Sequence, residues 1–401
     1  MNAFQSADLL LPQDTDLHRW SVIACDQFTS DKAYWQRVKD AVGDSRSTLH
    51  LILPEVELGD DVAIRAAKIH AAMESYLQAD AFKCYENAYI YVERSTPFGN
   101  LRRGIVGVVD LEQYDYHNDT TLPVRATEQT VIDRLPPRKT IRQGAPLELS
   151  HILLLCDDDK FTLVEPITEI KDTLPKVYDF DLMEDGGHVA GWLLQADVAC
   201  ALDARLAEYT RVHEQLGGTI FAVGDGNHSL AAAKDCYEQW KKENPGVDTA
   251  AFPGRYAMAE LENIHDPVQQ FEPIHRIVTN TDCAKLLSDL KTITVAEGCP
   301  VQCVTAEGTV TVCLPAPSGE RAVGILQAFL DRWLAENTGS IDYIHGDEAL
   351  TALARQEHAA GFLLPAMDKS GLFQAGVLPR KTFSMGHAQE KRYYLEGRRI
   401  K

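Results

Sequence analysis

Apolar residues along the chain recur either at helical spacing or in short continuous runs. The helical spacing predicts helices over residues 29–42, 60–81, 198–215 and 318–336. Thr29 or Ser30 is expected to cap the first of them. The short apolar runs predict strands over 20–24, 49–54, 88–93, 103–109, 151–156, 161–164, 273–278, 309–314 and 360–365.

These elements do not alternate in a regular strand–helix–strand order. The sequence therefore predicts a mixed α/β fold of the α+β kind, in which mixed sheets pack against helices. Residues 151–156 and 161–164 are expected to pair as a hairpin across the turn "DDDK". A seam is predicted near 244–248, so that 1–245 forms an N-terminal α/β region and 246–401 a C-terminal one, either separate or packed into one compact unit.

One junction between a strand and a helix concentrates unusual residues. The stretch "TIFAVGDGNHSLAAAKDC" begins with an apolar strand at 220–223 and continues into a helix with Leu230, Ala233 and Tyr237 on one face. That helix is expected to stop at the Asn-Pro-Gly of 244–246. Between strand and helix lie two glycines, a carboxylate, an amide, an imidazole and a hydroxyl.

Such a junction suits the binding of an anion. The first amides of a helix have no partner within the helix and carry partial positive charge, so a phosphate is stabilised there. Gly226 leaves the backbone open and tolerates positive φ, while Asp225 could hold a divalent cation or a hydroxyl group. His228 could donate to a phosphate oxygen, and Asn227 or Ser229 could cap the helix. The alternative is a plain turn in which Asp225 and Asn227 satisfy local backbone groups.

Composition and charge narrow the range of partners. The share of hydrophobic residues, 45%, is typical of a globular protein, and no apolar run is long enough to cross a membrane. The start of the chain lacks the pattern of a secretory signal, and the nine cysteines are scattered, so a cytoplasmic protein with reduced thiols is expected. A net charge of −20 disfavours nucleic acid as a partner.

The only dense group of arginines lies at 121–142, within this acidic chain. Arg125 and Arg134 could contact phosphate, and Glu128 could act as a base. If Thr127 caps a short helix, Glu128 lies in the first turn of that helix. The alternative is a surface helix and loop with ordinary ion pairs.

Two further segments carry candidate residues. Asp26 follows a predicted buried strand directly, which is where α/β sheets place ligand contacts. Lys381, in "LPRKTFSMG", is suited to an anionic ligand. A strand-edge loop without a ligand is the alternative for the second segment.

The segment "VGDGNHSLAAA" resembles the Asp-Gly-His-His-Arg box of the chromosome-partitioning ParB and sulfiredoxin-like superfamily. Asp225, Gly226 and His228 match that box, whereas Asn227 replaces its first His and Ser229 replaces its Arg. The resemblance implies a strand–turn–helix site that holds nucleotide phosphates, as in the nucleoside-triphosphate hydrolases and the free-serine kinase of that superfamily. Without the Arg, one bidentate phosphate contact is lost.

A longer resemblance covers most of the chain. The segments "WSVIACDQFTSDKAYW", "STLHLILPE", "RATEQTVIDRLPPR", "VGDGNHSLAAA" and "LPRKTFSMG" occur in the order typical of the domain of unknown function 1015 family. The resemblance implies membership of that family, and the family brings no established reaction.

Two hypotheses follow for the function. In the first, the protein is an enzyme of phosphoryl transfer or nucleotide hydrolysis: the 224–229 junction holds the phosphates, Arg125 and Arg134 neutralise charge, Glu128 or Asp26 activates the hydroxyl, and Asp225 holds Mg²⁺. In the second, the same site binds an anionic metabolite without turnover. DNA partitioning is disfavoured by the charge, and formation of a homo-oligomer stays open.

Overall fold

The computed structural model describes residues 2–117, 120–149, 151–216, 219–369, 371–374, 378–379, 381–386 and 390–401. The chain forms two compact units, here called the larger and the smaller unit. The larger unit comprises Met1–Ala126, Thr130–Gln269 and His387–Lys401, and the smaller unit Thr127–Gln129 and Gln270–Gly386. The division at 245/246 stays a prediction.

A mixed sheet runs through the larger unit in the order β5-β6-β11-β8-β12-β4-β3-β2-β19-β7. The pairs β6/β11 and β8/β12 are parallel, and β8/β11 and β4/β12 are antiparallel. The strands, with β1, β9 and β10 off this path, are β1 (Phe4–Gln5), β2 (Ala7–Pro12), β3 (Phe82–Ser95), β4 (Leu101–Asp110), β5 (Tyr114–Asp115), β6 (Val124–Ala126), β7 (Leu147–Leu149), β8 (Leu153–Cys156), β9 (Lys176–Asp181), β10 (His188–Leu194), β11 (Phe221–Asp225), β12 (Tyr256–Asn263) and β19 (Gly397–Arg399).

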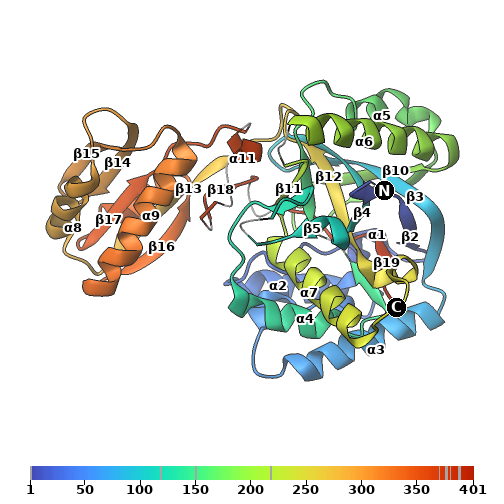
Figure 1. Ribbon diagram of the computed structural model, residues 1–401. Coiled ribbons are helices and arrows are strands. Elements are labelled where there is room, and N and C mark those ends of the chain that lie inside the picture. Colours follow the sequence, from blue (N-terminus) through green and yellow to red (C-terminus); the bar gives the residue numbers. More distant parts are fainter. Residues whose placement is uncertain are drawn as a thin grey trace. The chain divides into compact units, whose positions relative to one another are not determined.

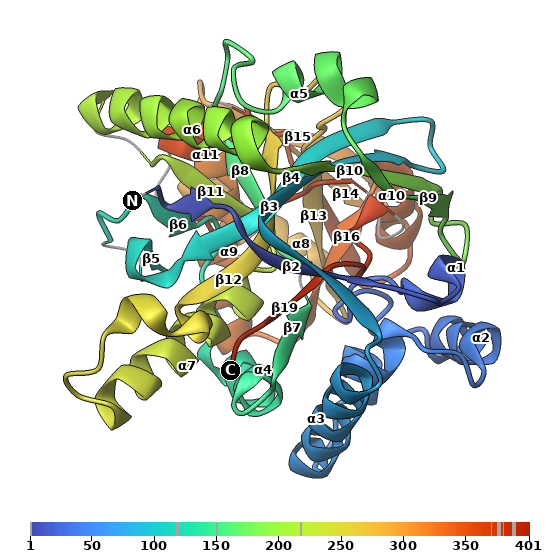
Figure 2. The ribbon, with the colours of Figure 1, turned by 90° about the vertical axis from the view of Figure 1, so that its right-hand side faces the viewer.

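Two hydrophobic clusters fill the two sides of this sheet. Trp35 of α2 and Ile69 of α3 belong to one cluster, and Leu206 of α6 and Leu230 of α7 belong to the other. In Figure 1 and Figure 2, α6 lies along the upper side of the unit and α3 along its lower side. The helices are α1 (Leu17–Trp20), α2 (Lys32–Val42), α3 (Val62–Gln78), α4 (Leu135–Arg142), α5 (Glu165–Ile170), α6 (Ala196–Leu216) and α7 (Asn227–Glu243).

The smaller unit has an antiparallel sheet in the order β15-β14-β17-β13-β16, with β18 paired to β13. Apolar residues of α8 and α9 form a common cluster with this sheet, and α10 packs in a second cluster. The elements are β13 (Glu272–Thr279), α8 (Cys283–Leu290), β14 (Cys299–Thr305), β15 (Gly308–Leu314), α9 (Gly319–Glu336), β16 (Ser340–His345), α10 (Asp347–Ala354), β17 (Ala359–Leu363), α11 (Gly371–Gln374) and β18 (Phe383–Ser384).

The mixed α/β fold predicted from the sequence is confirmed, and so are the long helices α3, α6, α7 and α9. The predicted strands near β3, β4, β8, β13, β15 and β17 are also present. In the part of the chain that the structure describes, no helix has the length and apolar character needed to cross a membrane.

Three predicted strands are wrong, and in the last two of them local hydrogen bonds hold the backbone in other conformations. Residues 17–20 form α1, and Ile23 makes only an isolated bridge to Tyr393. Residues 48–51 form a 3₁₀ turn that Ser47 caps. The 161–164 segment is a turn, since the Asp158 carboxylate accepts the amides of Thr162 and Leu163.

Two predicted helix caps are also wrong. Asp31, rather than Thr29 or Ser30, caps α2 by accepting the Tyr34 amide at 2.9 Å. Thr127 caps no helix, because Glu128 forms a parallel β-bridge with Leu378 instead. The helix in this region begins later, at Leu135.

Candidate functional site

The backbone between β11 and α7 favours glycine at position 226. Gly226 is the N-cap residue of α7 and has a φ of +79°, in the left-handed region that favours glycine. A Cβ atom there would lie 3.0 Å from Ile152 Cγ1 and 3.1 Å from its Cα, so the residue just before β8 crowds any side chain at this position. The expected cap by Asn227 or Ser229 is wrong, since the N-cap position is occupied by Gly226, which has no side chain. Asn227 instead donates from its side-chain Nδ2 to the Val223 carbonyl, at 3.5 Å.

Asp225 is held between the backbone of the junction and a lysine. Its Oδ1 accepts the Gly226 amide at 2.9 Å, and its Oδ2 lies 3.2 Å from Lys391 Nζ. Lys391 is buried, with 9% of its surface exposed. A buried ammonium group beside the start of a helix adds positive charge where the helix already favours anions.

A second cluster contains Asp26, His151, Ser229 and Tyr394. His151 Nε2 lies 3.2 Å from Ser229 Oγ and 3.6 Å from Asp26 Oδ2. Its Nδ1 lies 2.8 Å from the Tyr394 hydroxyl, which also accepts the Cys25 amide at 3.3 Å. In the tautomer with its proton on Nε2, His151 donates toward Asp26 or Ser229 while its Nδ1 accepts the Tyr394 hydroxyl. The Nε2 edge of the ring faces Ser229 and Asp26.

The charge of Asp26 is stabilised by its surroundings. Burial by itself raises the pKa of a carboxyl group, but the nearby His151 and the hydrogen bond from Gln27 outweigh it, so the pKa of Asp26 lies below its ordinary value. The charges of Arg138 and Lys391 act in the same direction. Asp26 is therefore an ionised hydrogen-bond acceptor at neutral pH.

His228 accepts a hydrogen bond at the nitrogen that could otherwise face a ligand. The Val131 amide donates to its Nε2 at 3.1 Å. Burial, followed by the charges of Arg138 and Arg134, lowers the pKa of His228 to about 4. The ring is therefore neutral at physiological pH, and only Nδ1 remains as a donor for a phosphate oxygen.

The arginines of the 121–142 segment are distributed along three elements. Arg125 lies on β6, opposite Ala222 of β11, and burial lowers its pKa. Arg134 ends the 3₁₀ turn Ile132–Arg134, and Arg138 of α4 donates to its carbonyl at 2.8 Å. Since both Arg134 and Arg138 act electrostatically on His228, the structure brings this part of the segment to the start of α7.

Glu128 and Lys381 belong to the smaller unit, where they are in contact. The Lys381 amide donates to Glu128 Oε1 at 3.1 Å, and Lys381 has a φ of +55°. That these two residues share a cleft with the 224–229 junction stays a prediction.

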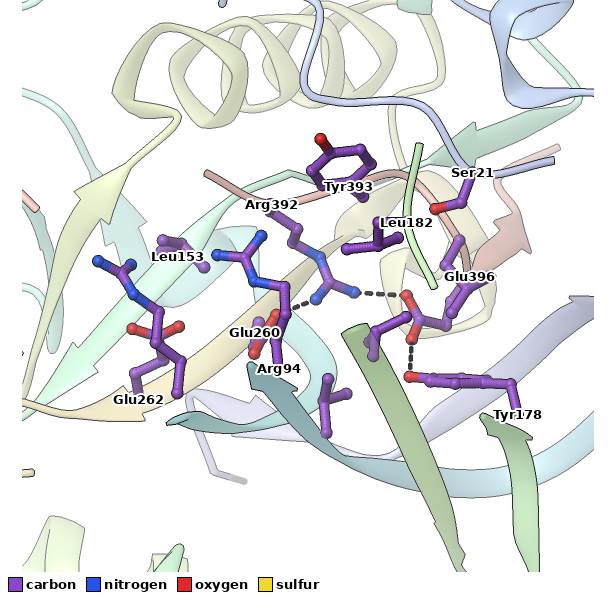
Figure 3. Close-up of a pocket in the computed structure, with 14 residues that line it drawn as sticks. Ser21, Arg94, Leu153, Tyr178, Leu182, Glu260, Glu262, Arg392, Tyr393 and Glu396 are labelled. Carbon is purple, nitrogen blue, oxygen red and sulfur yellow. Dashed lines mark hydrogen bonds and ion pairs between the residues drawn. The ribbon is translucent and has the colours of Figure 1, made fainter. Parts of the chain in front are cut away.

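Buried ion pairs hold the segment that carries Lys391 and Tyr394. Figure 3 shows the Arg392 guanidinium between the carboxylates of Glu260 and Glu396, with both of which it pairs. Tyr178 donates to Glu396 at 2.6 Å, beside a cavity of about 20 Å³, which is room for one water molecule. Arg94 donates to the carbonyls of residues 390 and 391. The pairs fix the backbone from which Lys391 reaches Asp225.

The sequence-based interpretation did not assign a role to His151, Lys391 or Tyr394. His151 lies 78 residues from Ser229, and Tyr394 lies 243 residues from His151, so no local spacing links them. For Lys391 the sequence offers only the basic composition of residues 389–401, and a run of charges is commonly a solvated surface.

The residues present can contribute to a magnesium site only in part. Among the described residues, no group of three His, Cys, Asp or Glu side chains is placed to hold a metal ion. Mg²⁺ is commonly bound by one or two carboxylates together with substrate phosphates. Asp225 fits that mode as a single carboxylate.

The sequence pattern of a protein family described as "Protein of unknown function (DUF1015)" matches residues 8–395 of this chain. No curated protein matches the sequence. The solved structures that match this chain include the following three. Truncated SbnI from Staphylococcus aureus is 8% identical, with a TM-score of 0.36, and the match covers 70% of this chain and 81% of that one. A free serine kinase in complex with AMP is 12% identical, with a TM-score of 0.38 and coverage of 73% and 90%. A conserved hypothetical protein from Pyrococcus furiosus is 11% identical, with a TM-score of 0.36 and coverage of 73% and 94%.

Proposed function

This chain belongs to the DUF1015 family, and we propose that it is an enzyme that transfers the terminal phosphoryl group of a nucleoside triphosphate to a small hydroxyl compound or to water. The nucleotide phosphates bind at the start of α7. The acceptor binds beside Asp26, Ser229 and His151.

One observation carries this proposal: cationic side chains lie near the start of α7, and the first turn of that helix has no acidic side chain. Lys391 lies 3.2 Å from Asp225 of the same junction, and Arg134 acts on His228 of the first turn. Arg138 acts on His228 as well, but its own charge is paired with Glu55. Positive groups in a partly buried site stabilise the charge of a phosphate and of the transition state of its transfer.

Asp26 is suited to receive the proton of the acceptor. In the proposed step the acceptor oxygen forms a bond to the terminal phosphorus, the bond from that phosphorus to the nucleoside diphosphate oxygen breaks, and the diphosphate leaves with the bond's electron pair. The proton of the acceptor hydroxyl passes to the Asp26 carboxylate. His151 orients Asp26 and Ser229 through Nε2, and Tyr394 fixes the ring from the other side.

Asp225 is the residue we expect to meet a magnesium ion carried by the nucleotide. When bound, the ion would neutralise phosphate charge. Lys391 would then contact a phosphate oxygen in place of the carboxylate. Glu128 and Lys381 stay predicted contributors from the smaller unit.

Calorimetric titration with ATP, ADP and AMP, with and without Mg²⁺, tests the proposal together with an assay for ADP release. We expect ATP to bind to the wild type, and Asp225→Ala or Lys391→Gln to lose most of the affinity while remaining folded. Lys242→Gln, at an exposed position near the end of α7, is the matched control and should bind as the wild type does. Failure of ATP to bind the wild type would refute the proposal. Binding without any release of ADP would favour a non-catalytic protein for an anionic ligand.

A further inference from the structure

An apolar cavity of about 130 Å³ lies beside the acceptor end of the site, within the larger unit. Ser229, His151 and Tyr394 form part of its wall, so it adjoins the cluster around Asp26. Most of the remaining wall is aliphatic and comes from α3, α4, α7, β12 and the 48–53 segment, including Leu51, Leu53, Met73, Ile141, Ala232 and Met258.

The size of the cavity sets the size of the group that it can receive. An apolar cavity of roughly 150 Å³ lined by Leu, Ile and Phe stays dry and binds benzene. A cavity of about 130 Å³ therefore has room for one ring or one branched aliphatic group of similar bulk. Binding such a group removes apolar surface from water on both sides.

The charged groups on the wall are already neutralised by protein partners. Arg142 pairs with Glu148, which also accepts Arg398 at 3.0 Å. Arg138 pairs with Glu55. A ligand in the cavity is therefore not required to supply a charge. The polar groups that remain for it are at the end formed by Ser229, His151 and Tyr394, where a hydroxyl group would be held.

We infer that this cavity receives the apolar part of the phosphoryl acceptor, which is an alcohol that carries one apolar group of about the size of a benzene ring. The inference rests on the proposed function for its chemical role, because the hydroxyl of such an alcohol would lie beside Ser229 and Asp26. The cavity thus selects the acceptor, while the start of α7 selects the phosphate donor.

Benzyl alcohol, with methanol as the small comparison, is the probe. Calorimetric titration should detect benzyl alcohol bound to the wild type and at least about tenfold weaker binding of methanol, because methanol lacks the ring that fills the cavity. Ala232→Leu places three more carbon atoms in the cavity and should weaken benzyl alcohol about tenfold or more. Ala71→Leu adds the same atoms at an exposed position of α3, the helix that supplies Met73, and should change nothing.

A second variant keeps the inference testable if Ala232→Leu does not fold. Met73→Ala enlarges the cavity and should shift the preference from benzyl alcohol to 2-naphthylmethanol. Equal affinity of the wild type and Ala232→Leu for benzyl alcohol, or no binding at all, would overturn the inference. Since benzyl alcohol needs no nucleotide, its binding to a protein that ignores ATP would leave the cavity assigned and the phosphoryl transfer refuted. ATP binding without benzyl alcohol binding would give the reverse result.

Discussion

Each unit contains a strand, a glycine with positive φ and a helix in direct succession, yet the first turns of the two helices differ in charge. Gly226 joins β11 to α7 with a φ of +79°, and Gly346 joins β16 to α10 with a φ of +84°. Both helices have glycine, which offers no capping side chain, at the N-cap position. The first turn of α10 contains Asp347 and Glu348, whereas the first turn of α7 contains no acid.

The difference teaches that backbone geometry alone does not make an anion site. At α10 the helix supplies its own carboxylates to its positive end, and Asp347 Oδ1 lies 2.8 Å from His275 Nε2. At α7 distant segments supply the cations Lys391 and Arg134 against one carboxylate, that of Asp26. The proposed function therefore predicts that a phosphate is attracted at α7 and repelled at α10.

The largest expected effect comes from removing the carboxylate of Asp26, which faces His151 in the larger unit. Asp26→Asn should reduce the rate of ADP release about 10²- to 10⁴-fold, because it removes the proton acceptor. ATP affinity should change far less. Asp347→Asn, which removes the carboxylate facing His275, is the control and should leave the rate unchanged. A rate for Asp26→Asn within a fewfold of the wild type would contradict the assignment.

The second effect is a pH dependence of stability near α7. His228 has a pKa of about 4 in the folded protein, against 6.5 for the ordinary side chain. The unfolded chain therefore takes up the proton first, and the free energy of unfolding falls by about 3 kcal/mol as the pH drops from about 6.5 to about 4. Above that range both states are neutral, and His228 contributes no pH dependence.

Urea unfolding of the wild type and of His228→Gln at several pH values measures this loss of stability. Glutamine does not titrate, and its Oε1 can still accept the Val131 amide. The pKa of His275 in the smaller unit is also lowered by burial, but its hydrogen bond with Asp347 opposes that shift. His275→Gln should therefore remove less of the pH dependence than His228→Gln. An identical pH profile for His228→Gln and the wild type would contradict the burial of a neutral His228.

The sequence predicts the β11–α7 junction well because its signals are local. An apolar run, a glycine and a helical repeat lie within about twenty residues, and each reports on its own backbone. The same local signals misled the interpretation at 49–54, where an apolar run packs into the core without a partner strand. Apolar character reports burial, and it does not by itself report strand pairing.

The cluster around Asp26 could not be predicted in full, because long-range pairing builds it. Asp26 and Ser229 were predicted separately, and it is His151, from a third segment, that joins them. Glu128 was predicted to lie in the first turn of a helix, but its backbone pairs with Leu378 across 250 residues. Such pairings depend on the whole fold, which no local spacing encodes.

The third effect comes from giving α7 the charge of α10. Asn227→Asp places a carboxylate at the first helical position, where α10 has Asp347, and should weaken ATP binding about tenfold by repulsion. Calorimetric titration at low ionic strength measures it, and added salt should reduce the difference. The reciprocal change, Glu348→Gln, should leave ATP affinity as it is. Unaltered affinity in Asn227→Asp would place the phosphates away from this helix start.

The smallest effect separates the two glycines by their surroundings. Alanine with positive φ costs roughly 1–2 kcal/mol at either position. A Cβ atom at Gly346 would meet no atom within 4 Å, whereas at Gly226 it would press on Ile152. Gly226→Ala should therefore lose about 1 kcal/mol more stability than Gly346→Ala. Hydrogen exchange of the α7 and α10 amides in each variant measures this difference. Because Ile152 is also part of the cavity wall, Gly226→Ala should weaken benzyl alcohol as well, and Gly346→Ala should not. Equal losses at the two sites would mean that β8 moves to accept the new atom, and that the close contact at Gly226 does not shape the site.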